Sequence, residues 1–140
     1  MAPLPNMETF DAPSREVACP SRQRTNTPLQ ALVMMNDPQF VEASRVMAQN
    51  LLQQGPAETS ARLDWIAIRL LSRSLEPEEK SILEQSRQKL EAIYAADPSV
   101  AREILKTGAA PPTKNFSASE VAVWTLMASQ IMNLDENLNK

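Results

Sequence analysis

Two pairs of neighbouring carboxylates are the residues of this chain that could most readily do chemistry. Glu78 and Glu79 form one pair, and Asp135 and Glu136 form the other. Such pairs can act as general acid and base or bind a hard cation. The first pair follows Pro77, where acidic residues stabilise the positive end of a helix dipole. The second pair lacks the oxygen-rich spacing of a calcium loop. We therefore interpret both pairs as capping or solvated carboxylates.

The sequence contains no histidine and a single cysteine, Cys19. Without histidine, Ser-His and Cys-His nucleophile activation, histidine-ligated haem and most zinc sites are excluded. Cys19 precedes Pro20 and has no base near it in the sequence, so we interpret it as a packing residue. The seven methionines are interpreted as filler of irregular core gaps. We expect no cofactor and no metal in this chain, and we expect it to be non-catalytic by itself.

Composition excludes several classes of protein. A length of 140 residues predicts one domain. The net charge of −3 argues against nucleic-acid binding, which needs a basic face that neutralises several phosphates. No run of about 18 apolar residues exists, so membrane insertion is not expected. The first residues also lack the charged and apolar regions of a signal peptide. The chain is therefore either a cytoplasmic protein or a piece of a longer one.

Proline and glycine usage predicts the fold class. Two glycines against eleven prolines disfavour β-hairpins and suit helices that begin at proline. The segment from Thr27 to Gln30 is a capping box with Pro28 at the first helical position. The sequence predicts helices over 28–35, 38–54, 57–72, 98–107 and 118–133, with a further helix that begins at Pro77. We predict an all-α orthogonal bundle of about six helices.

The predicted bundle has two parts. Residues 1–26 are expected to form an irregular arm, because its four prolines disfavour a helix there. Met7 and Phe10 are expected to anchor this arm by packing on the helical domain, residues 27–140. Within that domain the helix over 57–72 is apolar around most of its circumference, so it is predicted to be the most buried element.

Polar side chains gather at the predicted helix ends, where they could cap orphan amides and carbonyls. One hypothesis is a latch, in which an arginine of the arm pairs with a carboxylate of the bundle. The other hypothesis is a ligand site built from the same groups. The candidate residues are Arg22, Arg24, Thr25, Asn26, Thr27, Asn36, Asp37, Asn133, Asp135 and Glu136.

Four motifs carry a family resemblance. They are Phe10-Asp11-Ala12-Pro13-Ser14-Arg15-Glu16, Arg24-Thr25-Asn26-Thr27-Pro28-Leu29-Gln30-Ala31-Leu32, Asn36-Asp37-Pro38 and Asn133-Leu134-Asp135-Glu136. In this order and spacing they resemble the planctomycete-type domain of unknown function 1553. That family has no established activity. Its members form the C-terminal part of large multidomain proteins, often behind c-type cytochrome modules and a companion domain.

The resemblance implies that this chain is the C-terminal portion of such a domain and that the parent protein is exported from the cytoplasm. The chain has no Cys-x-x-Cys-His and carries none of the parent's haem. The leading hypothesis is a non-catalytic helical module that packs against upstream and companion domains. The alternative is part of an enzyme or ligand-binding site, with polysaccharide as the suggested ligand, that an upstream portion completes. That alternative requires Asp37, Asp135 and Glu136 to meet in one cleft.

Overall fold

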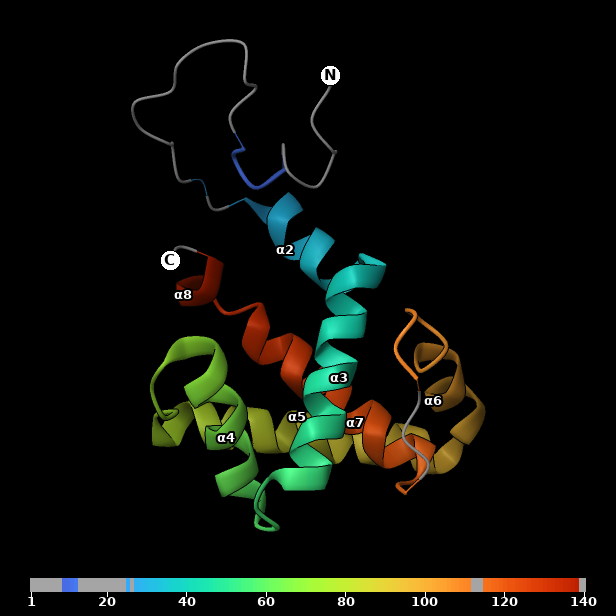
Figure 1. Cartoon of the computed structure of the whole chain (residues 1–140). Coiled ribbons are helices and arrows are strands. Elements are labelled where there is room, and N and C mark those ends of the chain that lie inside the picture. Colours follow the sequence, from blue (N-terminus) through green and yellow to red (C-terminus); the bar gives the residue numbers. More distant parts are fainter. Residues whose placement is uncertain (1–8, 13–24, 26, 112–114, 139–140) are drawn as a thin grey trace.

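The computed structural model describes residues 9–12, 25, 27–111 and 115–138. Across these ranges the chain forms a bundle of helices without a strand (Figure 1). This confirms the predicted all-α bundle; of the predicted arm over 1–26 the structure describes only residues 9–12 and 25. The helices are α2 (Pro28–Asn36), α3 (Pro38–Gln54), α4 (Thr59–Leu71), α5 (Pro77–Ala96), α6 (Pro98–Ile104), α7 (Ala118–Met132) and α8 (Asp135–Leu138).

Helix starts follow the local sequence signals. Proline opens α2, α3, α5 and α6, where its missing amide hydrogen is not needed and its fixed φ suits the helix. The residue before the proline caps three of these helices with a side-chain oxygen: Thr27, Asp37 and Asp97. The start of α7 is capped in the same way by Ser117. These starts lie where the sequence predicts them.

The centre of the bundle is α7, and the prediction that the helix over 57–72 is the most buried element was wrong. Helix α7 packs against α3, α5, α6 and α4, so its buried residues point in every direction. In α4 the buried residues occupy one side, while Ile68 is 51% exposed. Arg69 covers the ring of Trp65, with its guanidinium carbon 3.3 Å from the ring centroid. Part of the apolar surface of α4 is therefore covered by its own arginine rather than by the core.

Several helix ends differ from the prediction by one to three residues, and one short helix was not predicted. Helix α6 ends at Ile104, three residues before the predicted end, and Gly108 adopts a left-handed φ of +90° in the loop that follows. A Cβ atom on Gly108 would lie 2.4 Å from the side chain of Glu42 on α3, so only glycine fits this approach. The short helix α8 was not predicted, because one helical turn has no apolar period to recognise.

Candidate functional site

The described part of the N-terminal arm is fastened to the start of α2 by a group that we call the arm clamp: Asp11, Thr25 and Gln30. Asp11 accepts hydrogen bonds from the backbone amide of Thr25 at 2.8 Å and from the Thr25 hydroxyl at 2.8 and 3.0 Å. Gln30 donates from Nε2 to the Thr25 hydroxyl at 3.0 Å and to the carbonyl of Thr9 at 2.9 Å. The clamp thus joins three segments that are separate along the chain.

Gln30 is the buried member of the arm clamp. Gln30 is 2% exposed, and its Oε1 also accepts from the Thr27 amide at 3.0 Å, which completes the capping box. A buried amide that lost these partners would carry an unpaid desolvation cost. Next to the clamp, the rings of Phe10 and Phe40 pack with centroids 5.8 Å apart. The polar bonds and this ring contact together hold residues 9–12 against α2 and α3.

The junction between α2 and α3 uses two of the predicted site residues as caps. Asn36 donates from its side chain to the carbonyl of Leu32 at 2.9 Å, which satisfies a carbonyl of the last turn of α2. Asp37 accepts from the amide of Gln39 at 2.9 Å and so caps the start of α3. These hydrogen bonds give both residues a structural role at this junction.

The predicted site residues near the C-terminus lie around α8. Asn133 ends α7, and its amide donates to the carbonyl of Ser129 at 3.0 Å. Asp135 and Glu136 occupy the first turn of α8, where the helix dipole favours negative charge. Glu136 reaches away from this turn to an arginine that the sequence reasoning missed, Arg73.

Arg73, in the connection between α4 and α5, binds two carboxylates at once. Its Nη1 and Nη2 donate to Glu79 at 2.8 Å each, and its Nε and Nη2 donate to Glu136 at 2.7–3.1 Å. These charge-assisted bonds are bidentate on both partners. The hydrogen bonds from Arg73, followed by the amide of Glu76, lower the pKa of Glu79 to about 2. The arrangement ties α8 to the start of α5.

Arg22, Arg24 and Asn26 lie outside the described residues, so the arginine latch stays a prediction. The other predicted site residues form two groups. Thr25, Thr27, Asn36 and Asp37 lie at the arm clamp, the start of α2 or the α2–α3 junction, and Asn133, Asp135 and Glu136 lie around α8. No sequence signal would have found Arg73, because its partners lie 6 and 63 residues away. Asp11 and Gln30 lie in the family motifs, but they were not predicted to be site residues.

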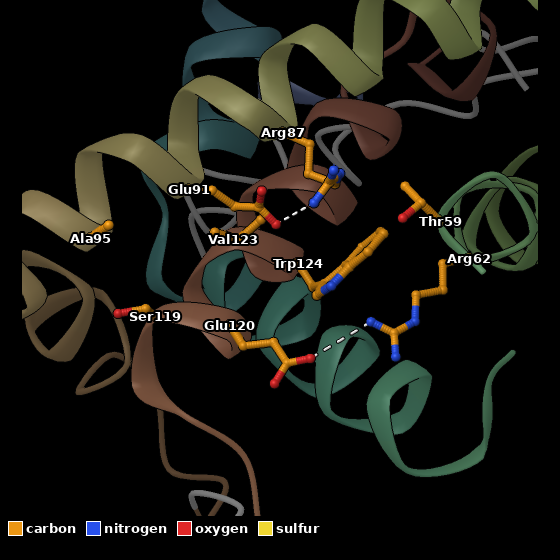
Figure 2. A pocket seen from close by; sticks show the side chains of 9 residues that line it. All are labelled: Thr59, Arg62, Arg87, Glu91, Ala95, Ser119, Glu120, Val123 and Trp124. Atoms are coloured by element: carbon orange, nitrogen blue, oxygen red, sulfur yellow. Dashed lines mark hydrogen bonds and ion pairs between the residues drawn. The ribbon is translucent and has the colours of Figure 1, made fainter. Parts of the chain in front are cut away.

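A cleft of about 280 Å³ opens between α4, α5 and α7 (Figure 2). Trp124 of α7 lies at its centre, 3% exposed, with the guanidinium of Arg62 5.4 Å from its ring centroid. Arg62 pairs with Glu120 at 3.7 Å, and Arg87 pairs with Glu91. Each carboxylate of the cleft therefore already has a cationic partner. Asp37, Asp135 and Glu136 are not among the residues that line this cleft.

The described residues also bear on metal binding and on membrane insertion. Nowhere in residues 9–12, 25, 27–111 and 115–138 do three or more histidine, cysteine, aspartate or glutamate side chains gather in a way that could hold a metal ion. Within the same ranges, every helix is too short or too polar to cross a bilayer.

Comparison with known families decides the membership of the chain. A family model described as Protein of unknown function (DUF1553) matches residues 1–86, which is more than half of the sequence. The chain belongs to the DUF1553 family. No curated protein and no solved structure gives a match.

The DUF1553 match includes the arm clamp, helices α2 to α4 and the first half of α5. Three of the four motifs quoted for the resemblance fall inside it. The closing motif at 133–136 falls outside it, as does the central helix α7. The segments that the arm clamp and the helix caps of α2 and α3 hold together thus lie within the matched range.

Proposed function

We propose that this DUF1553 chain is a non-catalytic helical module that binds another part of a longer protein through the exposed face of α2. The observation that carries the proposal is the apolar side of this helix. Leu29 is 56% exposed, Leu32 is 52% exposed and Met35 is 49% exposed. Their spacing of three residues makes them neighbours on the helix surface. A contiguous group of large exposed apolar side chains is typical of an interaction surface.

The opposite side of α2 holds this face in place. Gln30 and Met34 are the buried residues of the helix. The arm clamp fixes the first turn through Gln30, Asn36 bonds a carbonyl of the last turn, and Asp37 caps the start of α3. Because both ends are fastened by hydrogen bonds, the face is pre-organised and loses little conformational entropy on binding. Fixing the orientation of α2 is the role that we assign to the motif residues.

The partner follows from the family resemblance. We propose that α2 packs on the upstream portion of the same domain or on a companion domain, within an exported protein that carries cytochrome c-like modules. The module itself would hold no haem, because the sequence has no Cys-x-x-Cys-His. Its part would be to position other domains outside the cytoplasm.

Hydrogen exchange in a longer parent chain tests this proposal. Docking of α2 should slow exchange of its amides about tenfold or more relative to the 140-residue chain, because a covered helix opens less often. The triple variant Leu29→Gln, Leu32→Gln and Met35→Gln should remove this protection and leave the isolated chain folded.

The control is the pair Ile82→Gln and Ile93→Gln, which changes two exposed apolar residues of α5. It should leave the protection of α2 unchanged. Equal exchange of α2 in the parent and in the isolated chain would rule out this face as the docking surface.

The cleft around Trp124 favours a second function, a ligand site that another portion of the parent completes. Its lining offers two arginines and two carboxylates. This function comes second because a sugar-binding platform needs an open aromatic face. The ring of Trp124 is instead buried and faces Arg62.

A further inference from the structure

A second cavity, of about 300 Å³, lies between α3, α6 and the start of α7. Its charged lining is entirely cationic: Arg45 of α3, Arg102 of α6 and Lys106 just after α6. Gln49 of α3 adds an amide. The volume is at the lower end of the range of about 300–1,000 Å³ that small-molecule sites occupy. None of these residues belongs to the family motifs or to the α2 face.

The decisive group in this cavity is the guanidinium of Arg45, which is 1% exposed. Its Nη2 donates to the carbonyl of Ala110 at 2.9 Å. Among the residues that the structure describes, none offers a hydrogen-bond acceptor to its Nε or Nη1. A buried charge with unpaired donors is unfavourable unless a partner compensates it. Two buried donors of Arg45 are therefore still able to bind an acceptor.

Arg45 forms a long ion pair with Glu42, which leaves its Nε and Nη1 without an acceptor. Glu42 Oε1 lies 3.9 Å from Nη2, beyond hydrogen-bond distance. It instead accepts from the amide of Ala110 at 2.5 Å, and its side chain packs against Gly108. Glu42 is thus committed to the loop after α6. At the rim, Lys106 is paired with Glu103, while Arg102 donates to the carbonyl of Pro98.

We propose that this cavity binds a small organic carboxylate with an apolar body. The unpaired guanidinium donors of Arg45 are buried, so the cavity wall must adjust for a ligand to reach them. They then supply charge-assisted hydrogen bonds to the carboxylate oxygens. The wall also contains the apolar residues Leu105, Phe116 and Val121. Such a wall favours a hydrocarbon body over a fully hydrated inorganic anion. The ligand would also attach the loop after α6 to α3, because Arg45 already holds Ala110.

Titration of the 140-residue chain with benzoate tests the proposal, with heteronuclear NMR to locate the site. Saturable shifts should appear at α3, α6 and the start of α7, with a Kd of about 1 mM or tighter. Benzamide has the same shape without the charge, and inorganic phosphate has charge without the apolar body. Both should bind at least about tenfold more weakly.

Variants separate a folding defect from a binding defect. Arg45→Met should fold, because a hydrophobic side chain of similar length replaces a poorly paired charge, and it should lose benzoate binding. Arg102→Gln and Lys106→Gln, both exposed, should each weaken binding about threefold by removing a rim charge. Lys89→Gln on α5 is the matched control and should change nothing. Benzamide or phosphate binding as tight as benzoate, or no shift with any probe, would overturn the proposal.

Discussion

Replacing Gln30 with alanine is expected to lower the free energy of unfolding by about 2–3 kcal/mol. The substitution removes the bonds from Nε2 to Thr9 and Thr25 and the bond that Oε1 accepts from Thr27. Because the site is almost fully buried, water cannot replace these partners without opening the arm. Urea unfolding followed by circular dichroism measures the change.

Gln39→Ala is the matched control for this prediction. Gln39 lies in the first turn of α3, as Gln30 does in α2, but its side chain is exposed. Since the two substitutions have the same effect on helix propensity, only the buried bonds of Gln30 distinguish them. The control should change stability by no more than about 0.5 kcal/mol. Equal losses in the two variants would show that the buried bonds add nothing.

Met127→Ala is expected to cost about 2–5 kcal/mol, the range for a large-to-small change in a core. Met127 is fully buried in the middle of α7, and helices pack around α7 on several sides. The cavity left by the side chain could not close without moving more than one neighbouring helix. Thermal and urea unfolding would report the loss.

The companion substitution is Ile68→Ala in α4, the helix that the sequence suggested as central. Ile68 is half exposed, so this variant should cost less than about 1 kcal/mol. A larger loss from Ile68→Ala than from Met127→Ala would mean that α4, rather than α7, is the centre of the core.

The helices could be predicted from the sequence because their starts are local. Thr27 with Pro28 and Asp37 with Pro38 each place a cap and a proline within two residues, and the structure has helices at these points. Which helix is central could not be predicted in this way. An apolar side chain such as Ile68 contributes to the hydrophobic pattern whether it meets the core or solvent, and only the packing of the other helices decides between them.

The candidate site was predicted in part, and the missed residues act over long sequence distances. Asp11 and Thr25 are 14 residues apart, and Arg73 and Glu136 are 63 apart, so neither pair has a local signature. Arg45 did leave a signal. It lies four residues after Val41 and three before Ala48, on the apolar side of the predicted helix over 38–54. An arginine at such a position indicates that its guanidinium is buried.

A double-mutant cycle between Asp11 and Thr25 tests most directly whether these motif residues fasten the arm. Asp11→Ala, Thr25→Val and the double variant are compared by urea unfolding. We predict a coupling energy of about 1–2 kcal/mol, as expected for a charge-assisted contact that two residues share. A coupling within about 0.3 kcal/mol of zero would contradict the arm clamp and with it the structural role proposed for the motif.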